Sequence, residues 1–303
     1  MEKVNIILQG DVINRLKDIE DNTIQCVVTS PPYWGLRDYG EDNQLGLEET
    51  PEEYVENMVK VFREVRRALK DDGTLWLNLG DSYAGNCSRA SNNGRAGYGN
   101  KREGTYIKSG KNIKPKDLVG IPWRVAFALQ QDGWYLRQDI IWHKPNPMPE
   151  SVTDRCTKSH EYIFLLTKSA NYYYDAESIK EKTLTYDNTN RDRDTTRLNN
   201  TPGRTRMAGL KTNNYEKRNK RSVWKINTQP YKEAHFAVFP EKLPELCIKA
   251  GSKEGDIVLD PFFGSGTTGF VAQRLYRKWI GIELNPEYIK IANKRFVQQE
   301  LFV

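Results

Sequence analysis

The feature that most constrains the fold of this chain is a short apolar run, Ile257–Leu259, that leads directly into a glycine-rich turn. The turn, Asp260–Gly269, has the sequence DPFFGSGTTG and opens a helical pattern that continues to about Arg274. A second apolar run follows at Trp279–Ile282. A strand, a tight turn, a helix and a further strand form the unit from which open α/β sheets are built. Such sheets bind ligands beyond the carboxyl ends of their strands, which is where this turn lies.

The remainder of the chain alternates in the same way. Apolar runs predict strands at Val4–Leu8, Ile24–Thr29, Thr74–Leu79, Leu136–Trp142 and Tyr162–Thr167. Helical spacing predicts helices at Val12–Lys17, Pro51–Leu69, Pro122–Gln131, Glu241–Ala250 and Pro286–Gln298, the second of them stopped by Lys70–Gly73. This alternation predicts an α/β fold: a mostly parallel sheet with helices on both faces.

A second motif, TSPPYW at Thr29–Trp34, also follows an apolar strand. Ser30 offers a polar oxygen, Pro31 and Pro32 stiffen the backbone, and Tyr33 offers an aromatic face. This combination suits a planar nitrogenous base, whereas the glycine turn suits a nucleotide-like cofactor. An ordinary proline turn is the alternative interpretation of the TSPPYW motif.

Composition adds loose bounds. The four cysteines, Cys26, Cys87, Cys156 and Cys247, have no C-x-x-C spacing, which argues against a disulfide framework or a zinc knuckle and predicts no metal. No apolar run approaches 18 residues, and the N-terminus lacks a signal-peptide pattern. We therefore expect a cytoplasmic protein that does not enter a membrane.

Positive charge is concentrated in two segments. Residues 180–232 contain 14 Lys and Arg against 5 Asp and Glu, and residues 85–116 contain 8 against 1, so the rest of the chain is net acidic. Both segments are poor in aliphatic residues. Solvated insertions are one interpretation; loops that order on a phosphate backbone are the other, and the basic charge favours the second.

The glycine motif alone is weak, because the pattern G-x-G-x-x-G of Gly264–Gly269 also occurs in dinucleotide-binding enzymes and in plain strand–helix turns. Glu283, nineteen residues after Gly264, is placed to accept hydrogen bonds from both hydroxyls of a ribose. NAD binding would explain these features equally well. The TSPPYW motif, however, has no place in a dehydrogenase.

Together, the DPFFGSGTTG and TSPPYW motifs resemble those of the DNA amino-methyltransferases, and their order resembles the permuted β class of that family. The resemblance extends to Gly73–Tyr83, Trp134–Pro149, Ser222–Trp224 and His235–Leu243. It implies a seven-stranded, Rossmann-like class I methyltransferase sheet and the cofactor S-adenosyl-L-methionine. We expect residues 1–182 to form the target-base half of the core, with a basic loop at 85–116, residues 183–232 a target-recognition insertion, and residues 233–303 the cofactor half.

The resemblance also implies a set of cofactor-binding residues. Asp11 would bind the adenine amino group, although an aspartate in a loop is often a helix cap. Phe239 would pack near the methionine end of the cofactor, or instead form a hydrophobic staple onto the next helix. The full set is Asp11, Phe239, Asp260, Phe262, Gly264, Ser265, Gly266, Thr267 and Glu283.

The expected chemistry is methylation of an amino nitrogen attached to an aromatic ring. Its lone pair is delocalised, so acceptors for both amino protons favour a pyramidal, nucleophilic nitrogen. Ser30 Oγ and the Pro31 carbonyl are the candidate acceptors, held by the Pro31–Pro32 kink, and Tyr33 would stack on a base flipped out of the duplex. The expected catalytic residues are Ser30, Pro31, Pro32 and Tyr33. Trp142, Lys144 and Asn146 are candidates for lining the base pocket, with Trp142 equally suited to the core.

The expected partner is double-stranded DNA, which also implies association with the nucleoid. Five arginines of the second basic segment are the candidate phosphate contacts: Arg191, Arg193, Arg197, Arg204 and Arg206. A homodimer and a cognate restriction endonuclease are left open as further partners.

Ser30 favours cytosine N4 as the methylated atom, because adenine-specific relatives often have aspartate there; adenine N6 is the alternative. Methylation of cytosine carbon 5 is excluded, because it needs a cysteine nucleophile in a Pro-Cys motif and no cysteine here follows a proline. RNA or protein amide-nitrogen methylation, typical of relatives with asparagine in place of Ser30, and an inactive DNA-binding scaffold are further alternatives.

Overall fold

The protein is described from a computed structural model that covers residues 3–36, 44–84, 113–182, 217–228 and 239–300. The chain divides into two compact units: Met1–Asp175 with Ser222–Val303, and Ala176–Arg221. The first unit contains the large sheet and its helices. In the second, a 3₁₀ turn at Glu177–Ile179 precedes two short antiparallel strands, β6 (Glu181–Lys182) and β7 (Lys217–Arg218), and Glu181 binds the side chains of Arg218 and Lys220.

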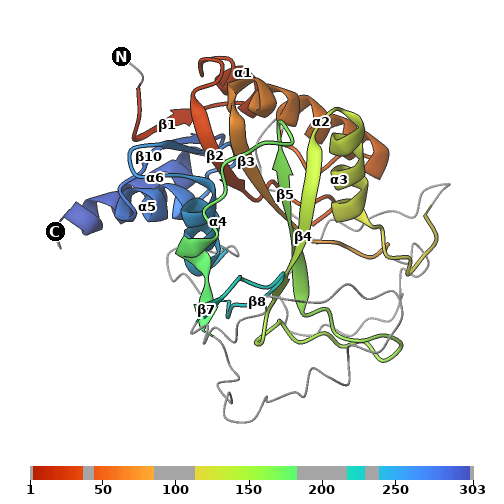
Figure 1. The fold of residues 1–303 in the computed structure, drawn as a ribbon. Coiled ribbons are helices and arrows are strands. Elements are labelled where there is room, and N and C mark those ends of the chain that lie inside the picture. Colours follow the sequence, from red (N-terminus) through yellow and green to blue (C-terminus); the bar gives the residue numbers. More distant parts are fainter. Residues whose placement is uncertain (1–2, 37–43, 85–112, 183–216, 229–238, 301–303) are drawn as a thin grey trace, which may run out of the picture. The chain divides into compact units, whose positions relative to one another are not determined.

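The large sheet has the strand order β1-β10-β9-β2-β3-β5-β4-β8 (Figure 1). Its strands are β1 (Ile6–Gln9), β2 (Ile24–Thr29), β3 (Leu69–Leu79), β4 (Tyr135–His143), β5 (His160–Thr167), β8 (Val223–Lys225), β9 (Ile257–Asp260) and β10 (Lys278–Glu283). Only β5 is antiparallel to its neighbours, β3 and β4. The expectation of a mostly parallel sheet is confirmed.

The expectation of seven strands was wrong by one. The eighth strand, β8, is three residues long and pairs in parallel with the edge strand β4, with Trp142 opposite Trp224. Only Trp224 of β8 is buried. A strand of three residues with one buried side chain is too short to show the alternating apolar pattern by which longer strands are predicted. Its pairing is stabilised by a tertiary contact, since the Trp142 indole donates a hydrogen bond to the Ile226 carbonyl at 2.9 Å.

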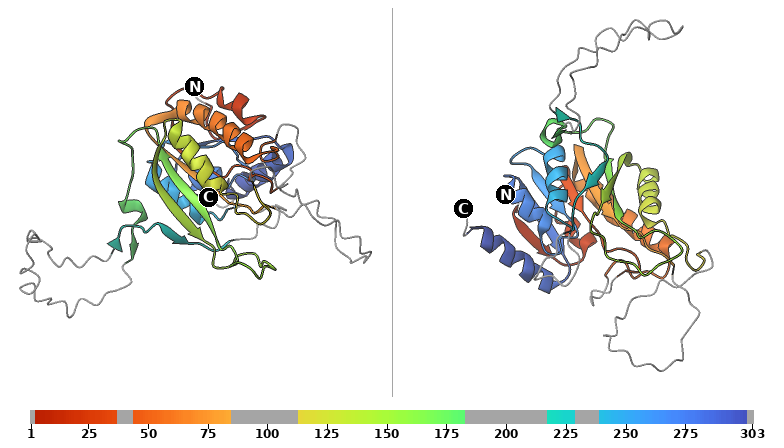
Figure 2. Two further views of the ribbon diagram at one scale, coloured as in Figure 1. Left: turned by 90° about the vertical axis from the view of Figure 1, so that its right-hand side faces the viewer. Right: turned by 90° about the horizontal axis from the view of Figure 1, so that it is seen from below.

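Helices cover both faces of the sheet. Figures 1 and 2 show α1 (Val12–Leu16), α2 (Pro51–Ala68) and α3 (Ile121–Gln131) on one face, and α4 (Lys242–Gly251), α5 (Thr267–Arg274) and α6 (Pro286–Glu300) on the other. The α2 helix begins with a capping box between Thr50 and Glu53, and its apolar stripe, which includes Tyr54, Met58 and Phe62, is fully buried. The first turn of α3 is capped from outside the helix, by Asp81 accepting from the amides of Gly120 and Ile121.

One expected boundary is incorrect. Lys70–Gly73 does not separate a helix from a later strand, because β3 begins at Leu69, directly after α2. The early part of β3 is held by Leu69 pairing with Ile24 of β2, followed by a shift in register before Cys26. A glycine is needed at position 73, since a Cβ there would lie 2.6 Å from the Leu69 side chain.

Strand order brings the two sequence motifs together. β2 and β9 are neighbours, with Val27 opposite Leu259, so Thr29 and Asp260 end adjacent parallel strands at the same edge. The carboxyl end of β3 lies beside that of β2. Since β5 is antiparallel and pairs Tyr162 with Leu79, its amino end, His160 and Glu161, reaches the same edge. No helix in the described ranges is long and apolar enough to cross a membrane.

Candidate active site

A buried carboxylate joins the two motifs. Asp260 is 1 % exposed, and its Oδ1 accepts from the Thr29 hydroxyl at 2.7 Å and from the Phe262 amide at 3.0 Å. Its Oδ2 lies 2.7 Å from the hydroxyl of Thr268. Burial raises the pKa of Asp260 to about 7, against the opposing effect of these bonds. Asp260 therefore connects the end of β2 to the first turn of α5.

The turn between β9 and α5 is shaped by two glycines with left-handed backbones. Gly264 has φ of +51° and faces open space where a Cβ would stand, so a ligand can approach its backbone closely. Gly266 has φ of +79°, and a Cβ there would lie 3.1–3.3 Å from Ala292, Phe263 and Phe296. Phe263 itself is core, stacked on Trp279 with ring centroids 5.2 Å apart.

Ser265, between these glycines, has a polar atom without a partner. Its Oγ is buried and makes no hydrogen bond within the described part of the chain. A buried hydroxyl without a partner is costly unless a ligand supplies one. The turn thus presents an open backbone at Gly264 and an unsatisfied hydroxyl at Ser265.

Glu283, at the end of β10, faces the same turn. One carboxylate oxygen accepts from the Gly264 amide at 2.7 Å and the other from the Asn285 amide at 2.8 Å. A carboxylate oxygen has two lone pairs and can accept more than one hydrogen bond, which is the chemistry that ribose hydroxyls require.

The other expected cofactor residues take different places. Asp11 caps α1, with Oδ1 accepting from the Asn14 amide at 3.0 Å. The hydroxyl of Thr267 accepts from the buried Arg295 guanidinium at 2.9 Å, so that side chain is engaged within the protein. Phe239 and Phe262 are both half-buried.

The TSPPYW segment begins at the end of β2, and its polar atoms form a chain of hydrogen bonds. The Ser30 hydroxyl lies 3.1 Å from the Tyr33 hydroxyl, which in turn donates to Glu161 Oε2 at 2.8 Å. Burial, followed by the nearby Glu161, raises the pKa of Tyr33 well above its ordinary value. Tyr33 therefore keeps its proton and acts as a donor to Glu161.

The residues around Tyr33 come from β3 and β5 and from the segments that directly follow β3 and β4. Its ring lies against Gly80, where a Cβ would be 2.5 Å from Tyr33 Cε2. Glu161 Oε2 also accepts from the Asn78 amide at 3.0 Å, and its Oε1 pairs with the Lys144 ammonium, which lies 4.5 Å from the centre of the Trp142 ring.

Sequence reasoning missed Glu161, Asn78 and Gly80 as members of the site. The available signal was that Asn78 and Gly80 lie at the carboxyl end of a strand beside the TSPPYW strand. Nothing in the sequence marked β5 as antiparallel, which is the property that brings Glu161 to this edge.

Further side chains of this region are structural. Trp34 is buried, and its indole donates to the Glu48 carbonyl at 2.9 Å. Trp142 is also buried, which favours a place in the core over the alternative of lining the base pocket. The side-chain amide of Asn146 donates to the Thr228 carbonyl and accepts from the Thr228 backbone amide. Lys158 is half-buried, and burial lowers its pKa despite the nearby Asp81 and Glu161.

The Pro31 carbonyl differs from its neighbour. The Pro32 carbonyl accepts from the Tyr54 hydroxyl at 2.9 Å, which anchors the loop to α2. Within the residues that the structure describes, the Pro31 carbonyl has no hydrogen-bond donor. The loop is therefore fixed at Pro32 and keeps an acceptor available at Pro31.

Several expected residues lie outside the described ranges. These are the five arginines, Arg191, Arg193, Arg197, Arg204 and Arg206, together with most of the first basic loop and His235–Val238 of the segment before α4. A metal site is not expected from the sequence, and the described residues contain no group of three His, Cys, Asp or Glu side chains that could hold an ion.

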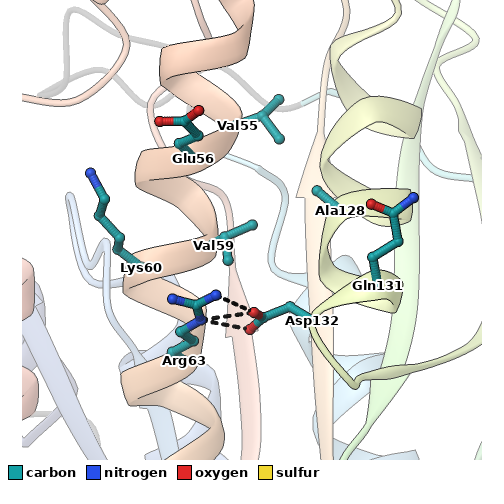
Figure 3. Close-up of a pocket in the computed structure, with 8 residues that line it drawn as sticks. All are labelled: Val55, Glu56, Val59, Lys60, Arg63, Ala128, Gln131 and Asp132. Carbon is teal, nitrogen blue, oxygen red and sulfur yellow. Dashed lines mark hydrogen bonds and ion pairs between the residues drawn. The ribbon is translucent and has the colours of Figure 1, made fainter.

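A separate groove lies between α2 and α3 (Figure 3). It is lined by Val55, Glu56, Val59, Lys60, Arg63, Ala128, Gln131 and Asp132. Arg63 and Asp132 close it with a paired contact that includes a 2.8 Å bond. No residue of either motif lines this groove.

Comparison with known proteins identifies the family. Residues 24–294 match the family model of the N6/N4 DNA methylases. The chain belongs to this DNA methyltransferase family. It is 49 % identical over 296 residues to the type II methyltransferase M.SmaI of Serratia marcescens, covering 97 % of this chain and 91 % of that protein. It is 47 % identical to M.Cfr9I of Citrobacter freundii, with 95 % and 86 % covered.

Solved structures agree on the fold. The PvuII DNA methyltransferase, described as cytosine-N4-specific, matches with a TM-score of 0.64 at 23 % identity, covering 96 % of this chain and 85 % of that one. A putative DNA modification methylase from Thermus thermophilus, complexed with S-adenosyl-L-methionine, matches with a TM-score of 0.59 at 24 % identity, covering 96 % and 93 %.

The cofactor of this DNA methyltransferase is S-adenosyl-L-methionine, as expected from the sequence. The residues present fit it: the open backbone at Gly264, the unpartnered hydroxyl of Ser265 and the carboxylate of Glu283 gather at one edge of the sheet. The acceptors of this edge suit the ribose hydroxyls of the cofactor, and the amino end of α5 suits its carboxylate.

Proposed function

We propose that this DNA methyltransferase methylates the N4 amino group of a cytosine that has been flipped out of double-stranded DNA. The observation that carries the proposal is the pair of acceptors at the TSPPYW loop. Ser30 supplies a neutral hydroxyl, and the Pro31 carbonyl is left available while the Pro32 carbonyl is fixed by Tyr54. Two acceptors match the two protons of an exocyclic amino group.

The cofactor supplies a methyl group activated by a positively charged sulfur, so the enzyme needs no nucleophile of its own. Ser30 Oγ accepts one amino N–H and the Pro31 carbonyl accepts the other. These bonds strengthen as the nitrogen becomes pyramidal, so they act mainly on turnover. The ring of Tyr33, seated on Gly80, stacks on the extruded base and offsets part of the cost of unstacking it.

The cofactor contacts are divided between direct ligands and supports. We assign the ribose hydroxyls to Glu283, the polar methionine end to Ser265 and the turn backbone, and the adenine amino group to the second oxygen of Asp11. Phe239 and Phe262 flank the cofactor. Asp260 and Thr267 support the turn through their internal bonds and do not reach the cofactor with their side chains.

We assign duplex DNA binding to the two basic segments, 85–116 and 183–232, which lie mostly outside the described ranges. Replacing Arg191, Arg193, Arg197, Arg204 and Arg206 together by glutamine should weaken DNA binding and reduce its salt dependence. If all five contact phosphates, the slope of log K against log salt falls by about 4.5. Cofactor affinity should not change. Duplex affinity that survives the replacement would make this segment a solvated insertion.

The base assignment is tested with purified enzyme, unmethylated plasmid DNA and cofactor carrying a deuterated methyl group. The DNA is digested to nucleosides and analysed by mass spectrometry. We expect label in N4-methylcytosine. Label in N6-methyladenine would overturn the base assignment but not the site. Parallel reactions with transfer RNA and with protein extract should remain unlabelled, and label there would contradict duplex DNA as the substrate.

A further inference from the structure

Glu161 is a charged residue of the target-base site that the proposed function does not use. It lies at the amino end of β5, is mostly buried, and touches Tyr33, Asn78 and Lys144. We propose that Glu161 is a positioning residue that sets the direction of the Ser30 hydroxyl through Tyr33, so that Ser30 meets the substrate only as an acceptor. This inference rests on the proposed methylation of an amino group.

The direction follows from counting hydrogens. A carboxylate has no hydrogen to give, so Tyr33 must be the donor in its 2.8 Å contact with Glu161. Tyr33 has a single hydroxyl hydrogen, which this bond uses. In the 3.1 Å contact with Ser30, Tyr33 must therefore accept, and Ser30 must donate. The only hydrogen of the Ser30 hydroxyl is thus turned away from the substrate, and its remaining lone pairs face the other way.

The position of Glu161 is itself fixed on both oxygens. Asn78 donates to the same oxygen as Tyr33, at 3.0 Å, and also donates to the Tyr162 carbonyl at 3.1 Å. Lys144 pairs with the other oxygen and lies over the Trp142 ring. These donors come from β3 and from the segment after β4, the two neighbours of β5. The carboxylate therefore cannot rotate away from Tyr33 without leaving a buried donor unpaired.

This polarity selects the type of group that can be methylated. An acceptor-only Ser30 binds an amino N–H and repels a ring nitrogen or carbonyl oxygen brought to the same point. If the chain of bonds were reversed, Ser30 would point a hydrogen at the substrate and would favour a ring nitrogen or carbonyl instead. Glu161 would thus contribute to the choice of an amino group without touching the base.

Glu161→Gln is the decisive variant, because glutamine keeps the shape but has only one acceptor oxygen. If that oxygen faces Tyr33, the amide NH₂ meets the Lys144 ammonium as a second donor. If it faces Lys144 instead, the NH₂ meets Tyr33 and reverses the chain. In the first arrangement the repulsion from Lys144 pushes the glutamine side chain out of line with Tyr33, and in the second the chain is reversed, so the alignment of Ser30 is disturbed in both. We expect kcat for DNA methylation to fall about ten- to hundredfold, with KM for DNA within about threefold of wild type.

A structural role of Glu161 would also lower activity, so the test is a double-mutant cycle with Tyr33→Phe. Tyr33→Phe keeps the ring but removes the hydroxyl that links Ser30 to Glu161. As a single variant it should lower kcat. Adding Glu161→Gln to Tyr33→Phe should then change kcat by less than about twofold. Wild-type turnover in Tyr33→Phe, or the same fall from Glu161→Gln in both backgrounds, would overturn the proposal. Glu245→Gln, which removes a carboxylate paired with Lys242 and Lys249 on α4, is the matched control.

A second readout does not need catalysis. Tyrosine labelled with ¹³C at Cζ reports the hydrogen bonding of the hydroxyl, and Tyr33→Phe identifies the Tyr33 signal. This signal should shift in Glu161→Gln and stay unchanged in Glu245→Gln; an unshifted signal in Glu161→Gln overturns the proposal. If the wild-type product is N6-methyladenine, only the cytosine assignment fails. If no DNA is methylated, the proposed function fails, and the Tyr33 signal alone decides the role of Glu161.

Discussion

The two halves of the proposed active site are supported in different ways. The glycine turn is held by neighbours in the sequence: Glu283, which binds the Gly264 amide, lies 19 residues away. The TSPPYW loop depends on distant residues: Glu161, which binds the Tyr33 hydroxyl, lies 128 residues away, on a strand that runs against its neighbours. One half is a local motif, whereas the other is assembled by the sheet.

This difference indicates a division of labour. Conformational requirements of the backbone and local acceptors shape the cofactor turn, so its substitutions should act on cofactor affinity. Side chains from β3, from β5 and from the segment after β4 align the loop, so its substitutions should act on turnover. The bond between Asp260 and Thr29 is the point at which the two halves join.

The largest effect is expected where the halves join. Asp260→Ala leaves the buried Thr29 hydroxyl and the Phe262 amide without their acceptor and removes one of the two acceptors within reach of Thr268, so the free energy of unfolding should fall by about 3 kcal/mol. Asp260→Asn should reduce stability far less. The Thr268 hydroxyl can donate its one hydrogen to the Val28 carbonyl, 3.2 Å away, and can then accept from the group at the position of Asp260 Oδ2. An amide NH₂ can donate to Thr268, as a protonated carboxyl does. Urea unfolding of both variants checks this; equal losses would contradict it.

Asp260 also gives the free energy of unfolding a pH dependence with a defined sign. The pKa of Asp260 is raised from 3.8 to about 7 on folding, so between these pH values the folded protein holds a proton that the unfolded chain has released. The contribution of this group to stability is therefore fully present below about pH 4 and declines as pH rises to about 7. Asp260→Asn should lack this decline. A constant difference in unfolding free energy between wild type and Asp260→Asn across this range would contradict the buried titration.

A smaller effect is expected at the cofactor turn. Glu283→Ala removes the acceptor proposed for the ribose hydroxyls, so affinity for S-adenosyl-L-methionine should fall by about 2 kcal/mol, or roughly thirtyfold. Titration calorimetry measures this directly. Glu287→Ala, which removes an exposed carboxylate on α6, is the control and should bind as wild type does. Unchanged affinity in Glu283→Ala would break the assignment of the turn to the ribose.

The smallest effect is expected at Gly80, beneath Tyr33. A methyl group there would lie 2.5 Å from the tyrosine ring, so Gly80→Ala should displace the ring and lower kcat about tenfold, while the cofactor binds normally. Adding Tyr33→Ala should make the two changes non-additive, because the ring that is displaced would be absent. Cofactor affinity that falls together with kcat in Gly80→Ala would argue against separate halves.

The sequence was informative about the fold and about where the glycine turn lies, between β9 and α5. Alternating helix and strand patterns predicted most elements to within two residues, because each buries a regular apolar face. Short β8 was missed, since only Trp224 marks it and its pairing depends on tertiary contacts. The donors around Asp260 were not predicted either: the sequence placed Asp260 among the cofactor ligands, and in the structure its oxygens face the Thr29 hydroxyl, the Phe262 amide and the Thr268 hydroxyl.

The loop support could not be predicted for a physical reason. Glu161 follows a histidine at the start of an apolar strand and has no motif of its own. Its place beside Tyr33 requires that β5 insert antiparallel between β3 and β4, and strand order is not encoded in local periodicity.

The division of labour is tested most directly by the rate of a single turnover in Ser30→Ala, measured at saturating S-adenosyl-L-methionine. Alanine removes one of the two acceptors proposed for the target amino group but leaves the glycine turn intact. The rate should stay about ten- to hundredfold below wild type however much cofactor is added, because the lost bond acts on the methylated nitrogen. A rate that returns to the wild-type value as cofactor is raised would place the defect in cofactor binding and contradict the account.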